Sequence, residues 1–128
     1  MITLLILFAI FTVTFTASDI VISGLKMSKE RYDSTKAYFA AESAGERIIW
    51  HVREPDFNTA GCVNGNYISF NDGDCGGNAP CCNGNTEIEY TLSNNAKYSI
   101  QYSYTAPDTT LSCLGKYSSV GRRVQLKY

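Results

Sequence analysis

The sequence lacks a large excess of charge, and its first 25 residues lack a basic residue altogether. With a net charge of −1, the chain has no overall electrostatic reason to bind nucleic acid. A secretory signal peptide normally opens with basic residues, so the missing basic flank argues against that class for residues 1–25. A length of 128 residues also leaves little room for a second core, which favours one globular domain.

The patterns of common catalytic and metal sites are also missing. The cysteines show no paired CxxC spacing and His51 stands alone, so we do not expect structural zinc. The acidic loop 71–74 offers oxygen ligands, but no distal acid follows at EF-hand spacing, which favours a solvated turn over calcium. No nucleophile–base arrangement or glycine-rich phosphate loop is present. We therefore expect neither an enzyme nor a cofactor.

What the first 25 residues do contain is an almost unbroken apolar run with one charge, Asp19. About 20 such residues cross the hydrocarbon of a bilayer as a helix. A removed signal peptide, an ordinary single-pass anchor, and a segment that serves first lipid and then protein all stay open. We favour the third, with a basic leader already removed and Met1 as the mature N-terminus.

The middle of this run is rich in hydroxyl and β-branched side chains. β-Branched residues restrict rotamers in a helix, Ser and Thr bond to nearby carbonyls, and glycine adds backbone freedom. We expect a firm helix to about Phe11, followed by a stretch that can loosen. The residues expected to allow this loosening are Thr12, Thr14, Thr16, Ser18 and Gly24.

Asp19 is costly in lipid, and a carboxylate in such a run usually has a partner or a watery setting. The candidate partners are Lys26, about two helical turns further on, and a cation on a neighbouring subunit. The alternative, a residue at the membrane edge, stays open.

Residues 26–54 keep a helical pattern in a more polar sequence. One apolar stripe recurs at spacings of three and four: Ala37, Ala41, Ala44, Ile48 and Val52. Lys29, Asp33 and Lys36 are expected on another face at ion-pairing spacing. Glu54-Pro55 predicts the end of the helix, because the residue before proline is pushed out of the α region.

Residues 55–128 are expected to form a cysteine-containing antiparallel β domain. Gly, Asn, Asp and Cys dominate to residue 85, where at most a short strand near 66–70 is expected. Beyond it, period-two alternation and a turn at 93–95 predict four strands: 87–92, 98–104, 110–117 and 121–128. The fold class is therefore α+β, a long N-terminal helix with its apolar half protruding, packed on a roughly four-stranded sheet.

The cysteines are predicted to brace loops as disulfides in an oxidising compartment. They are Cys62, Cys75, Cys81, Cys82 and Cys113. This number leaves many pairings open and one thiol over, and the adjacent Cys81 and Cys82 are expected to have different partners. Reduced, buried cysteines of a cytosolic protein are the alternative.

The C-terminal strands carry basic and aromatic residues. Arg122, Arg123 and Lys127, with Lys116 nearby, can form a small basic patch, more typical of a solvated face than of a DNA site. Alternation predicts that most of the tyrosines serve the sheet core. These tyrosines are Tyr98, Tyr102, Tyr104, Tyr117 and Tyr128.

The order of these segments is similar to that of the bacterial type IV pilin family. The stretch AYFAAESAGERIIWHV, Ala37–Val52, looks like the Ala- and Glu-rich helix of minor-pilin-like members. The ending SSVGRRVQLKY looks like the last strand of that group. The resemblance covers essentially the whole chain and is architectural. It implies a structural subunit of an extracellular filament for adhesion, motility or uptake.

The resemblance also implies partners and a location. A prepilin peptidase would remove the leader, Met1 would be N-methylated, and an inner-membrane pool would feed the assembly machinery. The subunit would then join a helical homopolymer, with other pilins, at the bacterial cell surface; direct nucleic-acid binding is not expected. Filament-core packing would fall to Leu4, Leu5, Leu7, Phe8, Phe11, Phe15 and Ile20.

The sequence departs from the family at two positions. Major pilins usually carry a glutamate at the fifth mature position, where this chain has Leu5, and the family's helix-breaking proline further along is missing. This departure favours a minor or tip pilin, or a divergent lineage. The alternatives to a main filament subunit are a minor pilin or pseudopilin that primes or caps a secretion-type filament, and a monomeric membrane-anchored surface binding domain.

Overall fold

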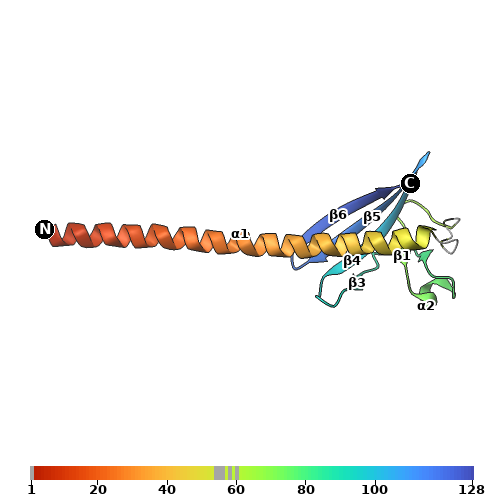
Figure 1. The fold of residues 1–128 in the computed structure, drawn as a ribbon, viewed down its shortest axis with the longest axis horizontal. Helices are drawn as coiled ribbons and strands as arrows, with labels where there is room; N and C mark the ends of the chain where they lie inside the picture. The colour runs from red at the N-terminus through yellow and green to blue at the C-terminus, as the bar shows by residue number, and fades with distance from the viewer. Residues whose placement is uncertain (1, 54–56, 58, 60) are drawn as a thin grey trace. The chain divides into compact units, whose positions relative to one another are not determined.

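The computed structural model describes residues 2–53, 57, 59 and 61–128. The expected processed end, Met1, and the expected helix stop, Glu54-Pro55, lie outside the described residues. The helix α1 runs from Ile2 to Arg53 (Figure 1). The chain divides into two compact units, Met1–Tyr32 and Asp33–Tyr128.

The first unit is helical, and every side chain from residue 2 to residue 32 is exposed. The hydroxyls of Thr12, Thr14, Thr16 and Ser18 donate to carbonyl oxygens three or four residues earlier, at 2.8–3.0 Å. These bonds add to the helix without ending it. The stretch from Thr12 to Gly24 is therefore regular helix here, and its expected loosening stays a prediction.

The second unit contains a four-stranded antiparallel sheet in the order β3-β4-β5-β6. Its strands are β3 (Tyr90–Thr91), β4 (Lys97–Thr105), β5 (Asp108–Tyr117) and β6 (Val120–Lys127). The α+β fold is thus confirmed, and the last three strands lie within a few residues of their predicted bounds. The turn expected at 93–95 joins β3 to β4, with Asn95 in the left-handed region at φ 63°. The first strand is shorter than predicted, because only Tyr90 and Thr91 pair with β4.

The second half of α1 covers the inner face of this sheet (Figure 1). The predicted stripe is confirmed: Ala37, Ala41, Ala44 and Ile48 are fully buried, and Val52 packs against the same core. The helix and the sheet approach closely at Gly115 of β5, where an added Cβ would overlap the backbone of Ala37 and Ala41. Alanines on the helix and a glycine on the sheet therefore bring the two backbones together.

The predicted polar face around Asp33 is wrong. Asp33 is only 7% exposed and lies one turn before Ala37, on the buried side of the helix. The Lys36 ammonium donates to the Tyr117 hydroxyl at 3.1 Å and lies 4.3 Å from the centre of that ring. Spacing alone does not tell which side of a helix the sheet will cover.

A small second sheet precedes the large one. The strand expected near 66–70 is confirmed as β1 (Ile68–Ser69), which pairs antiparallel with β2 (Cys81–Cys82). Between them lies the short helix α2 (Asp72–Cys75), in a loop expected to be a solvated turn. Asn71 caps α2 by accepting a hydrogen bond from the amide of Gly73, and Gly76 ends it in the left-handed conformation.

Candidate functional site

An apolar surface dominates the first unit. By length and composition alone, α1 is able to cross a membrane, and none of the side chains in its most apolar part is buried. The residues expected to pack in a filament core are 61–74% exposed: Leu4, Leu5, Leu7, Phe8, Phe11, Phe15 and Ile20. Each is favourably transferred out of water, at about 25 cal/mol per Å² of apolar surface. This surface therefore needs lipid or protein as its cover.

Aromatic side chains share one face of this segment. Phe8, Phe11 and Phe15 are spaced by three and four residues, which places them on one side of a helix. The ring centres of Phe11 and Phe15 are 5.7 Å apart. Both rings, with Thr14 and Ser18, line an open hollow of about 190 Å³. Phe8, Phe11 and Phe15 thus form an aromatic ridge along one face of the helix.

Asp19 continues this face four residues after Phe15. Among the described residues, no ion pair joins it to Lys26 or to any other cation. Seven residues of helix separate the two, a rise of about 10 Å, too far for a direct contact. The cation on a neighbouring subunit and the membrane-edge setting stay predictions.

The cysteines pair as two disulfides that brace residues 62–82. Cys62 bonds to Cys82 with a Cα–Cα distance of 5.2 Å, and Cys75 bonds to Cys81 at 5.6 Å. The expectation of different partners for the adjacent Cys81 and Cys82 is confirmed. Cys113 is the thiol left over, and burial raises its pKa to about 11. Its thiolate is therefore scarce at neutral pH, and the residue serves the core.

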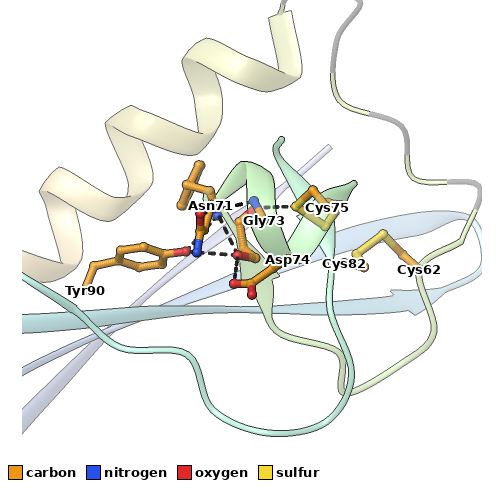
Figure 2. Close-up of a disulfide and its surroundings, with 10 residues drawn as sticks. Cys62, Asn71, Gly73, Asp74, Cys75, Cys82 and Tyr90 are labelled. Carbon is orange, nitrogen blue, oxygen red and sulfur yellow. Dashed lines mark hydrogen bonds between the residues drawn. A yellow bond between two sulfur atoms is a disulfide. The ribbon is translucent and has the colours of Figure 1, made fainter. Parts of the chain in front are cut away.

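Tyr90 connects the braced segment to the large sheet (Figure 2). Its hydroxyl accepts a hydrogen bond from the amide of Phe70 at 2.7 Å and lies 3.2 Å from the Ser69 hydroxyl. Ser69 in turn donates to the carboxylate of Asp74, at the end of α2, at 2.8 Å. One of the two acids of loop 71–74 is thus held by a neighbouring hydroxyl.

Arg47 joins α1 to both sheets. Its guanidinium donates to the Tyr98 hydroxyl at 2.7 Å and lies 4.1 Å from the centre of the Phe70 ring. The centre of the Tyr90 ring lies 5.6 Å from the same guanidinium carbon. Cation–π contacts and a charged hydrogen bond therefore fix the helix against the braced segment.

The basic patch expected on the C-terminal strands is wrong as a single cluster. The Lys116 ammonium bonds to Glu87 at 2.7 Å and to Glu89 at 2.9 Å, so its charge is neutralised. Arg122 and Arg123 point to opposite faces, because strand side chains alternate. The Arg122 side chain donates to the Ser34 hydroxyl at 2.8 Å.

The tyrosines divide between core and surface. Tyr98 and Tyr102 are 4% and 6% exposed, as alternation predicts, and Tyr117 packs against the core. Tyr104 and Tyr128 are about half exposed, at 47% and 52%. The prediction that most of these five tyrosines serve the sheet core is therefore confirmed, by Tyr98, Tyr102 and Tyr117.

A cavity of about 460 Å³ opens between the end of α1 and the edge strand β6. Its lining is mainly apolar, with two cationic residues and one phenol: Ile49, Val52, Arg53, Leu111, Gln125, Leu126, Lys127 and Tyr128. Burial raises the pKa of Tyr128 above its ordinary value. No hydrogen bond or ion pair between described residues engages the side chain of Arg53 or Lys127.

Comparison with known proteins identified no relative of this chain. No protein-family model matches the chain, and no curated protein or solved structure matches it significantly. The described arrangement offers binding surfaces, an apolar helix and an apolar cavity.

Proposed function

We propose that the chain is a structural subunit of an extracellular type IV pilus-like filament, which assembles through its N-terminal helix for adhesion, motility or uptake. The uncovered apolar surface of residues 2–25 carries the proposal. The large apolar side chains there are 52–75% exposed, whereas the alanine stripe of the second unit is fully buried. The sheet covers the apolar stripe in the second half of α1, and the apolar side chains of the first half need other chains or lipid to cover them.

The segment suits both surroundings in turn. In a bilayer its apolar side chains face hydrocarbon, and its backbone groups are satisfied within the helix. Transfer from lipid to a helix bundle gains little hydrophobic free energy, because lipid tails are already apolar. Close packing among several copies then has to drive polymerisation, and the work of an inner-membrane assembly machinery is needed to extract each chain from lipid. The aromatic ridge of Phe8, Phe11 and Phe15 supplies side chains for such packing.

The second unit fits an outer location. Two disulfides brace its loops, which is typical of small domains in oxidising compartments such as a bacterial surface. On the side of α1 away from the sheet, Phe39 and Trp50 are 57% and 58% exposed. The second unit thus has uncovered apolar rings of its own, as expected of a helix with neighbours along its length.

One residue favours a second candidate, a minor pilin or pseudopilin that primes or caps a filament. Leu5 stands where the resemblance leads us to expect the glutamate of a main subunit. Copy number separates the two candidates. Filaments made almost wholly of this chain support the first, and a few copies at one end support the second.

The test is to shear producing cells and analyse the released material by mass spectrometry of the intact chain. We expect the chain in a sedimenting polymer, with an N-terminal mass that reports processing and methylation of Met1. Replacement of Leu5 by glutamate should hinder or re-register assembly, because it adds an unpaired carboxylate to an apolar bundle. A conservative change, Leu5→Ile, serves as control. A chain that stays in the membrane fraction, with no polymer, supports the monomeric surface domain instead.

A further inference from the structure

The cavity beside β6 has three properties of a ligand-binding site: its volume, its apolar floor and its cationic lining. It is about 460 Å³, roughly three times the 150 Å³ that holds one benzene molecule. Its buried floor is aliphatic, with Leu111 only 1% exposed. Arg53 and Lys127 line it from α1 and β6, and both are exposed. Such a site suits a ligand with an apolar group next to a negative charge.

The first unit carries this combination. Phe15 and Asp19 are four residues apart, so the ring and the carboxylate lie next to each other on one face of the helix. Asp19 is the single charge among the first 25 residues, and Phe15 is 64% exposed. Burial of the ring would remove apolar surface from water or lipid contact, and a cation would stabilise the lone carboxylate.

We propose that the Phe15–Asp19 pair of one copy docks in the β6 cavity of a second copy, with the ring among Val52, Leu111 and Leu126 and the carboxylate on Arg53 and Lys127. This inference rests on the proposed filament and names the contact that holds neighbouring copies in register. Arg and Lys both have the reach for such a contact, since each carries its charge on a long flexible stem. Docking gives the Asp19 carboxylate a cationic partner, whereas an unpaired carboxylate makes this segment costly in lipid.

The test uses native residues of the full chain. A carbodiimide joins a carboxylate to an amine only when the two are in contact, and here it would join Asp19 to Lys127. Chains labelled with ¹⁵N are mixed with unlabelled chains, polymerised by detergent removal, cross-linked and digested. We expect an Asp19–Lys127 link of mixed isotope composition in the polymer, and none in the detergent-solubilised monomer. Linkage of Asp19 to Lys26 or another lysine in its place overturns the inference.

Charge reversal gives an independent readout. The double change Arg53→Glu and Lys127→Glu should raise the critical concentration for polymerisation about 10-fold or more, because it sets like charges against Asp19. Adding Asp19→Lys should restore much of the loss. Arg123→Glu is the control, since it reverses a charge on β6 outside the cavity lining and should change assembly by less than about 2-fold.

Two failures are distinguishable. If the unaltered chain forms no polymer, the proposed function fails and this inference fails with it. If polymers form and the reversed cavity assembles as well as the control, only the docking contact is wrong. Circular dichroism of each variant in detergent confirms that the second unit is folded.

Discussion

The two units of this chain use the same helix for opposite purposes. From Asp33 onward its small residues are buried against a sheet, whereas from Ile2 to Tyr32 every side chain is exposed. The first stretch is the more apolar of the two, yet it has no internal core. Apolar content therefore does not make a core by itself: a complementary surface does, and the sheet provides one only for the second stretch. Stability should depend on contacts inside the second unit, and assembly on the surface of the first.

The largest effect is expected at the helix–sheet contact. Gly115→Ala places a methyl group where the backbone of Ala37 and Ala41 already lies, so α1 must move away from β5. We expect a loss of about 3 kcal/mol or more in the free energy of unfolding. Urea unfolding followed by circular dichroism in detergent measures it. Gly121→Ala is the matched control, since its added Cβ meets nothing closer than 3.7 Å; equal effects of the two changes would contradict the close contact.

The disulfides should follow in size. Replacing both Cys62 and Cys82 by serine opens a loop with a sequence separation of 20 and should cost about 3 kcal/mol. The same change at Cys75 and Cys81 opens a separation of 6 and should cost about 2 kcal/mol. Thermal unfolding of the two double variants checks the order. A reversed order would contradict loop closure as the source of the stabilisation.

The Arg47 contacts are expected to contribute less. Arg47→Ala removes a charged hydrogen bond to Tyr98 and the stacking on Phe70, for a loss of about 1–2 kcal/mol. Glu46→Ala, an exposed neighbour on the same helix, should change stability by less than about 0.5 kcal/mol. A double-mutant cycle of Arg47→Ala with Tyr98→Phe isolates the hydrogen bond. Zero coupling would show that the bond does not stabilise the fold.

A smaller effect should appear with pH. Hydrogen bonds from Lys116 lower the pKa values of Glu87 and Glu89 below their ordinary 4.5 and raise that of Lys116 above 10.5. The carboxylates stabilise the fold above pH 4.5, and this contribution is lost as pH falls through their lowered pKa values. The lysine's contribution is present below pH 10.5 and is lost as pH rises through its raised pKa. Since these groups are about one-third exposed, we expect only about 0.2–1 kcal/mol.

This pH effect is measured by comparing unfolding of the unaltered chain and Lys116→Gln between pH 3 and pH 7. The difference between the two chains should shrink at the acidic end. A difference that stays constant with pH would contradict the role of the two carboxylates.

The smallest effect on stability is expected in the first unit. Phe15→Ala should leave the unfolding of the second unit unchanged within about 0.5 kcal/mol, because Phe15 has no buried contact. The same variant should polymerise poorly, and Phe15→Leu should retain more assembly. A variant that unfolds more easily yet assembles normally would reverse the division of roles between the two units.

The main elements of the fold follow from local patterns that can be seen in the sequence. Ala37, Ala41, Ala44 and Ile48 repeat at helical spacing, and the alternating tyrosines of β4 repeat at strand spacing, so both buried faces are predictable. The elements α2 and β2 are missed because residues 71–82 are almost all Asn, Asp, Gly and Cys and show no apolar periodicity. Only tertiary contacts stabilise such short elements.

Errors about individual side chains have a common origin. Asp33 fits an ion-pairing pattern, but the position of the sheet buries it. In the sequence Lys116 has no evident partner, but in the fold it forms ion pairs with Glu87 and Glu89. Disulfide partners and the cavity beside β6 likewise depend on residues far apart in the chain. Sequence spacing describes one element at a time, and these features arise between elements.

The central claim is that residues 2–25 are covered by other copies of the chain. Electron imaging of sheared filaments with helical reconstruction tests it most directly. We predict helices packed around the filament axis, with Leu4, Phe8 and Phe15 in contact with neighbouring chains. Filaments in which this segment faces solvent, or surface material in which the chain is a membrane-bound monomer, would contradict it.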